Sequence, residues 1–178
     1  MDAALTALIG AAVGSLATLG SAMLTGRNTA RAQFVQWRRQ HRRDAYAGYL
    51  GALHDRDLAR DAVLEALRPQ DPDLPEVDAK VERFVTLARS VHRAAEIVHL
   101  EGPAAAVAAA DDVARASEEL SAVVRRMVER ARAGDTSGRA ADTALAAERE
   151  HDLYQAVKAF RTTAAGALGQ PGTGGVRQ

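Results

Sequence analysis

Cysteine is absent from this chain of 178 residues, and aromatic side chains make up only 4% of it. The lack of cysteine excludes a disulfide scaffold, a thiol nucleophile, a cysteine-based zinc site and an iron–sulfur cluster. The chain also has no alternating runs of β-branched residues, no phosphate-binding glycine loop, and neither the G-x-S-x-G nor the H-E-x-x-H motif. The sequence therefore predicts an all-α protein that is not an enzyme, binds no cofactor and has no evident small-molecule substrate.

A long stretch without charge occupies the N-terminus. The 24 residues 3–26 contain no charged side chain, and as a helix they would span roughly 36 Å, enough to cross a bilayer. A cleaved signal peptide would need a basic region ahead of the apolar stretch, where only Asp2 is charged. A buried soluble helix is the other alternative. We expect residues 1–26 to form a transmembrane anchor.

Arginines follow this stretch directly. Residues 27–43, here called the basic collar, hold six arginines and no acid, whereas acidic residues outnumber basic ones from Asp44 onward. Cytoplasmic flanks of membrane helices carry the excess of positive charge, so we expect a bacterial inner-membrane protein with its N-terminus outside and most of the chain in the cytoplasm. The collar arginines are Arg27, Arg31, Arg38, Arg39, Arg42 and Arg43.

The collar also has the pattern of a basic amphipathic helix. Phe34, Trp37, His41 and Ala45 fall on one side of a helix, and several of the arginines lie beside them. Such a face can rest on anionic lipid headgroups. The alternative is that the arginines only set the topology and the aromatic residues begin the core of the following domain. The sequence leaves both interpretations open, and it predicts membrane lipid as a partner.

Small residues recur every four positions within the predicted anchor. A stripe of this kind lets a second helix approach closely, which favours association with another copy of the chain or with another membrane protein. The alternative is chance, because the whole segment is rich in small residues. The stripe consists of Thr6, Gly10, Gly14, Thr18 and Ala22.

The rest of the chain shows helical periodicity interrupted at three places. Prolines at 69, 72 and 75 end the first helical region, and Pro75 fits the first turn of the next helix. Gly102 and Pro103 predict a tight hairpin, and residues 134–138 predict a loop. Between these points apolar residues recur in steps of four and three. We expect the N-terminal helix to continue into an antiparallel cytoplasmic bundle of about four long helices over residues 44–168, followed by a disordered tail at 169–178.

Two Glu-x-x-His pairs raise the possibility of metal binding. Glu96 with His99 and Glu148 with His151 have the spacing used by carboxylate-bridged di-metal bundles. A helical projection, however, turns Glu148 and His151 away from the apolar face of their own helix. A metal-binding bundle is therefore an alternative function, and the leading prediction is that no metal is bound.

Charged clusters elsewhere are interpreted as structural. Asp57 and Arg60 have the spacing of an ion pair within one helix. The arginines between 125 and 132 are interleaved with glutamates and are expected on a solvated face. No helix-turn-helix, zinc-finger or RNA-binding pattern accompanies these charges, which disfavours nucleic acid as a partner.

The stretch Gln36–Leu50 (QWRRQHRRDAYAGYL), directly behind an alanine- and glycine-rich anchor, resembles small single-pass membrane proteins of actinobacteria, some of them described as kilB-like. The resemblance covers about the first 50 residues. It implies a membrane location and offers a third hypothesis, a role in plasmid transfer or beside nucleic acid. Our leading hypothesis is a membrane-anchored helical scaffold or regulatory protein.

Overall fold

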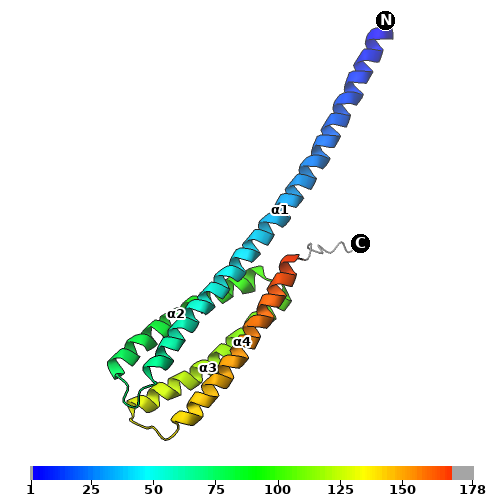
Figure 1. Ribbon diagram of the computed structural model, residues 1–178. Coiled ribbons are helices and arrows are strands. Elements are labelled where there is room, and N and C mark those ends of the chain that lie inside the picture. Colours follow the sequence, from blue (N-terminus) through cyan, green and yellow to red (C-terminus); the bar gives the residue numbers. More distant parts are fainter. Residues whose placement is uncertain (1, 170–178) are drawn as a thin grey trace. The chain divides into compact units, whose positions relative to one another are not determined.

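Four helices and no strand make up the described part of the chain. The computed structural model describes the backbone of residues 2–169 and the side chains of Arg31 and residues 33–169. Figure 1 shows α1 (Asp2–Ala66), α2 (Leu74–Glu101), α3 (Ala104–Arg132) and α4 (Arg139–Gly169). The expectation of an all-α protein with four long helices is confirmed.

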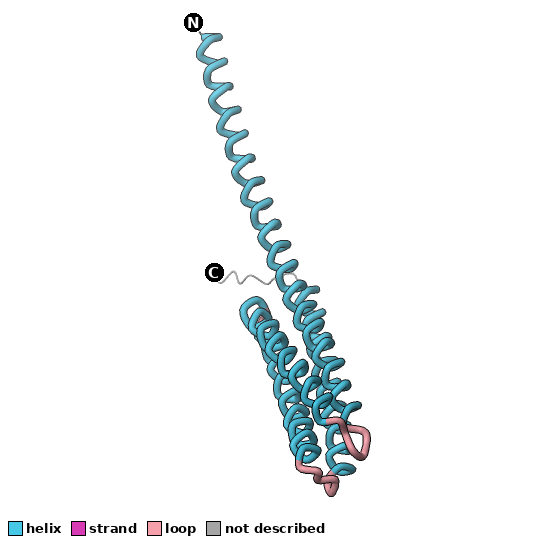
Figure 2. The backbone as a smooth tube through the Cα atoms, turned by 90° about the vertical axis from the view of Figure 1, so that its left-hand side faces the viewer, coloured by secondary structure: helices cyan, strands magenta, loops and turns pink. Residues whose placement is uncertain are grey.

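The chain divides into two units, residues 1–40 and residues 41–178. The second unit, here called the bundle, consists of the end of α1 together with α2, α3 and α4, each running opposite to the one before it (Figure 1). The loops after α1 and after α3 lie at one end of the bundle, as Figure 2 shows. The turn between α2 and α3 lies at the other end, together with the last turn of α4.

Among the residues searched, which are those the structure describes, no helix is long and apolar enough to cross a membrane. The predicted anchor and its small-residue stripe fall on residues 1–26, whose side chains lie outside that description. The same holds for the side chain of Arg27 and for the predicted tail beyond Gly169. The anchor therefore stays a prediction.

The helix ends follow the local chemistry that the sequence indicates. Pro75 lies in the first turn of α2, where its missing N–H removes no hydrogen bond within the helix. The N–H of Gly102 donates to the carbonyl of Val98 at 2.8 Å and closes α2, and Pro103 immediately precedes α3. The predicted hairpin is thus confirmed.

A left-handed glycine ends α3. Gly134 has a φ of 66°, a conformation that a side chain would make unfavourable. Its N–H donates to the carbonyl of Ala131 at 3.1 Å, and the N–H of Asp135 donates to the carbonyl of Arg130 at 2.9 Å. This pair of bonds is the Schellman arrangement, which supplies partners for carbonyls that the helix end leaves without one.

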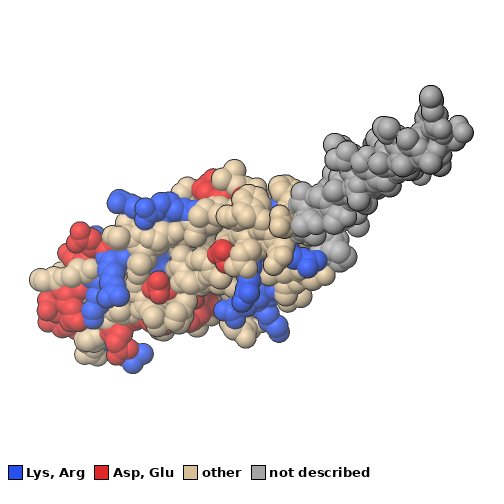
Figure 3. All heavy atoms as spheres, turned by 90° about the horizontal axis from the view of Figure 1, so that it is seen from above, with Lys and Arg blue, Asp and Glu red and all other residues tan. Residues whose placement is uncertain are grey.

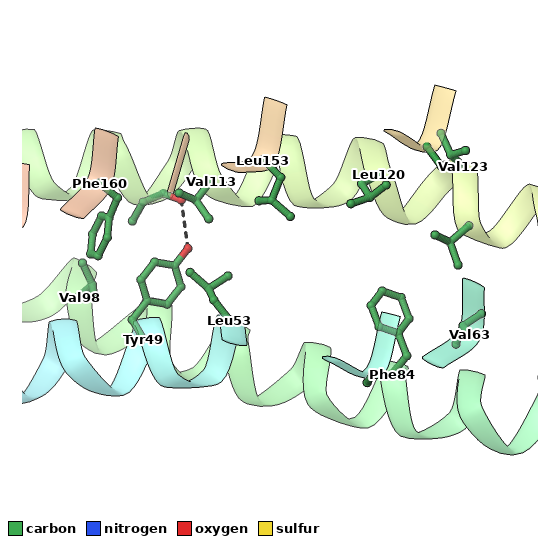
Figure 4. Close-up of a cluster of buried hydrophobic side chains, with 14 of the residues drawn as sticks. Tyr49, Leu53, Val63, Phe84, Val98, Val113, Leu120, Val123, Leu153 and Phe160 are labelled. Carbon is green, nitrogen blue, oxygen red and sulfur yellow. Dashed lines mark hydrogen bonds between the residues drawn. The ribbon is translucent and has the colours of Figure 1, made fainter. Parts of the chain in front are cut away.

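The bundle core runs lengthwise between the helices and has aromatic rings at one end (Figure 4). Phe160 of α4 is fully buried, and its ring lies edge-on to Tyr49 at 5.1 Å and to Tyr46 at 5.8 Å between ring centroids. The hydroxyl of Tyr49 donates to the carbonyl of Ala110 at 3.4 Å. Leucines, valines and Phe84 fill most of the rest of the core (Figure 4). The fully buried valines are Val63, Val77, Val98, Val113 and Val124.

Because Tyr49 is buried, the free energy of unfolding of the bundle should fall at alkaline pH. Burial is the largest of the effects on this side chain, and it raises the pKa of Tyr49 from 10.0 to about 12. Because the folded pKa is the higher one, the stabilisation is complete below pH 10 and is lost as pH rises from 10 to 12. A shift of two pKa units corresponds to about 3 kcal/mol.

We expect the Tyr49→Phe variant to lose less stability than the unaltered protein between pH 10 and pH 12. At pH 7 the two should differ by less than about 1 kcal/mol, because the variant lacks only one long hydrogen bond. Urea unfolding followed by circular dichroism at both pH values is the measurement. Tyr154→Phe is the matched control, since Tyr154 is exposed; an equal effect from this control would contradict the assignment.

Candidate functional site: the basic collar and the charged clusters of the bundle

An exposed aromatic pair marks the basic collar. Phe34 and Trp37 are 56% and 54% exposed, and their rings stack with centroids 6.1 Å apart. The guanidinium of Arg38 lies 5.9 Å from the centre of the Phe34 ring, close enough for a cation–π contact. One interpretation of the sequence was that these two aromatic residues begin the bundle core. Their exposure shows that they do not.

The collar arginines divide into two groups. Arg31, Arg38, Arg39 and Arg43 are exposed. Arg42 instead donates from Nε to the backbone carbonyl of Glu101 at 2.8 Å. That carbonyl belongs to the last turn of α2, where the helix leaves carbonyls unpaired and a positive charge is favoured. One of the six arginines therefore contributes to the bundle itself.

The bundle part of α1 has a buried face that sequence reasoning missed. Residues in steps of three and four form it, with two arginines in the middle. This pattern is typical of a coiled-coil seam, so Arg56 and Arg60 hold positions that apolar residues usually fill. The signal was present in the sequence as the spacing of the surrounding apolar residues. The seam consists of Tyr46, Tyr49, Leu53, Arg56, Arg60, Val63 and Leu67.

Arg60 is buried, and the ion pair with Asp57 that the sequence predicts is confirmed. Its side chain is only 6% exposed and contacts three carboxylates: Asp57 at 3.1 Å, Asp61 at 2.8 Å and Glu150 at 3.0 Å. Glu150 comes from α4, so this cluster joins two helices. Burial raises the pKa of Asp57, and the charge of Arg60 partly opposes that rise. The sequence did not show the contact with Glu150, because it does not reveal which helix faces Arg60.

A second cluster joins α3 to the beginning of α4. Asp142, whose side chain is 5% exposed, accepts hydrogen bonds from Arg126 at 2.9 Å and from Arg130 at 2.8 Å. Both arginines were expected on a solvated face, and their side chains are 43% and 36% exposed. The sequence did not show that both bind the buried Asp142. Asp142 also lies in the first turn of α4, where the helix dipole favours a carboxylate. On the face drawn in Figure 3, acidic side chains are densest at one end of the bundle and lie among basic ones over the rest.

The two Glu-x-x-His pairs do not come together. His99 lies 3.1 Å from Asp111 of α3, and Glu96 lies 3.9 Å from His92. On α4, Glu148 is near Arg149 and His151 is near Gln155. Within the described residues, no group of three or more histidine, aspartate or glutamate side chains is placed to hold a metal ion.

The loop end of the bundle holds a pocket of about 450 Å³ between α1, α3 and α4. Its walls combine apolar residues with charged ones, several of which are already paired. Arg130 and Asp142 bind each other, and Glu150 binds Arg60. These charges serve to hold the helices together.

Comparisons with protein-family models, with curated protein sequences and with solved structures found nothing that matches this chain. The resemblance to actinobacterial kilB-like proteins stays a prediction. The case for a function therefore depends on the residues described above, of which the exposed part of the collar is the most distinctive.

Proposed function

We propose that this chain is a membrane-anchored helical interaction protein, a scaffold or regulator without catalytic activity. In this proposal residues 1–26 cross the bacterial inner membrane and the bundle lies in the cytoplasm. The observation that carries the proposal is the exposed Phe34–Trp37 pair beside exposed arginines, directly after 24 uncharged residues.

Interfacial chemistry supports this combination. Tryptophan is enriched at the membrane–water boundary, where its ring meets the acyl chains while its N–H stays among polar groups. Each arginine near an anionic surface contributes about 1 kcal/mol. Four exposed collar arginines therefore supply a substantial attraction, and the exposed aromatic rings supply apolar area that would otherwise face water.

Two surfaces are available for protein partners. The stripe centred on Gly10 and Gly14 allows close helix approach inside the membrane. On the bundle, Leu100 and Ile97 near the end of α2 are exposed apolar side chains. A second copy of the chain or another membrane protein is the partner that this arrangement favours.

The anchor is tested by a charge in its middle. We expect the full chain to stay in the membrane pellet after an alkaline carbonate wash, and Leu16→Arg to release a large part of it. An arginine at the centre of a membrane helix costs about 2.5–3.5 kcal/mol for insertion. Leu58→Arg is the matched control, because Leu58 is an exposed leucine of the bundle. Release of the unaltered protein by carbonate would contradict both the anchor and the proposed location.

The collar is tested through its own fluorescence, because Trp37 is the single tryptophan. With the full chain reconstituted in vesicles, we expect lipids brominated near the headgroup to quench Trp37, and more strongly when anionic lipid is included. Changing Arg31, Arg38, Arg39 and Arg43 together to glutamine should remove the dependence on anionic lipid. If the quenching of Trp37 in the unaltered protein were the same with and without anionic lipid, the arginines would set the topology only.

A further inference from the structure

A second pocket, of about 370 Å³, opens between α2 and α3. Its walls are largely apolar and include Phe84 and Val85 of α2, with Val124 and Val128 of α3. Val85 is 46% exposed and lies at the accessible side. This volume is within the range of sites for small organic molecules.

The guanidinium of Arg56 reaches this pocket from the seam of α1. Its Nη2 donates to the Ser121 hydroxyl at 2.6 Å, and its Cζ lies 4.9 Å from the centre of the Phe84 ring. Among the described residues, no carboxylate oxygen lies within 4 Å of Arg56, whereas Arg60, one turn further along α1, contacts three. Arg56 is a largely buried cation without an ion pair.

One side of Arg56 faces a separate small void of about 10 Å³, which Ser117 and Asp57 also line. Arg56 Nε and the Ser117 hydroxyl are buried and find no hydrogen-bond partner among the described residues. That void has room for a single water molecule, which could bond to both groups. A water there would satisfy Nε but would not give Arg56 an ion pair.

The charges around the pocket do not neutralise Arg56. Asp57 and Glu118 are the acids that act on Arg56, but Asp57 is bound by Arg60 at 3.1 Å and Glu118 by Arg125 at 2.7 Å. Glu129 is a further acid of the pocket wall. Arg132, another wall residue, is bound by Asp78 on α2. Burial lowers the pKa of Arg56, and the neighbouring acids only partly oppose that effect. A buried cation in this condition is unfavourable until an anion joins it.

We propose that this pocket binds a small organic monocarboxylate, whose apolar body lies between Phe84 and Val128 and whose carboxylate pairs with Arg56. A guanidinium matches a carboxylate with two parallel hydrogen bonds, and Nη1 has no partner among the described residues. A single negative charge balances the single unpaired cation. A doubly charged phosphate would bring more negative charge than Arg56 can balance, next to the carboxylate of Glu118.

The experiment measures ligand binding to the full chain by NMR titration of the ligand's own signals. The probes are 4-phenylbutyrate and its uncharged analogue 4-phenylbutanol, with a blank that contains the same detergent and no protein. We expect the acid to bind at least about tenfold more tightly than the alcohol, because only the acid pairs with Arg56. Arg56→Gln should abolish this preference.

Two further variants keep the test decisive. Arg89→Gln removes an arginine from an exposed position of α2 that does not line the pocket, and it should leave both affinities unchanged. Val85→Glu places a negative charge at the pocket wall and should weaken binding of the acid about tenfold without unfolding the bundle, because Val85 is exposed. Equal binding of acid and alcohol, no saturable binding of the acid, or an equal loss in Arg89→Gln would overturn the proposal.

Discussion

Replacing Phe160 by alanine should destabilise the bundle by about 4 kcal/mol, the largest effect that we expect from a single substitution. The ring is fully buried and lies edge-on to two tyrosines of α1, Tyr46 and Tyr49. Its removal loses the transfer free energy of the ring and leaves a cavity between α1 and α4. The aromatic pairs also contribute about 0.5–1.5 kcal/mol each beyond the buried area.

Urea unfolding monitored by circular dichroism measures this change. Tyr154→Ala is the matched control, because Tyr154 lies on the same helix and is 59% exposed. We expect the control to cost less than about 1 kcal/mol. If both variants lost the same stability, the contact between Phe160 and the two tyrosines would not hold α4 to α1.

The second large effect is expected from Arg60→Ala, at about 3 kcal/mol at pH 7. Arg60 is buried and contacts Asp57, Asp61 and Glu150, which come from two helices. Its removal leaves three carboxylates close together with no cation between them. The expected cost lies at the low end for broken buried ion pairs, because the three carboxylates are partly exposed to water.

Acidic pH should partly restore the Arg60→Ala variant. Burial already raises the pKa of Asp57, and Arg60 opposes this rise, so the pKa of Asp57 should be higher still without Arg60. When the folded pKa is raised, the group favours the folded state at low pH, and that contribution is lost as pH rises through the folded pKa. The deficit relative to the unaltered protein should therefore be smaller at pH 4.5 than at pH 7, as measured by urea unfolding.

Arg89→Ala is the control for the loss of an arginine from an exposed helix position. It should cost less than about 0.5 kcal/mol at both pH values. A deficit of Arg60→Ala that did not change with pH would show that loss of the packed aliphatic stem, and not the three carboxylates, explains the effect.

The helix boundaries could be predicted because their causes are local. Pro75, Gly102 and Pro103 act through their own backbone geometry, whatever packs around them. The apolar steps along the later helices likewise indicated buried positions such as Val77, Val113 and Phe160, all of which are fully buried. A heptad spacing can be recognised within one helix, without knowing which helices pack against it.

The role of the charged residues could not be predicted in the same way. Asp142 looked like one acid among many, and its burial depends on Arg126 and Arg130 from the neighbouring helix. Arg60 showed a partner on its own helix but not Glu150, which lies far away in the sequence. An ion pair within one helix and an ion pair between two helices have the same local pattern.

The amino-acid sequence by itself determined the helical class, the number of helices in the described residues and the points at which they turn, because proline, glycine and apolar spacing act over a few residues. It also placed the charge-free segment and the basic collar one after the other. Only the tertiary structure decided that Phe34 and Trp37 are exposed and that Arg42 binds the end of α2. It also decided that Arg60 contacts three carboxylates whereas Arg56 forms no ion pair. The physical reason is that the free energy of a buried charge depends on what faces it, and only the packing of one helix against another sets those neighbours.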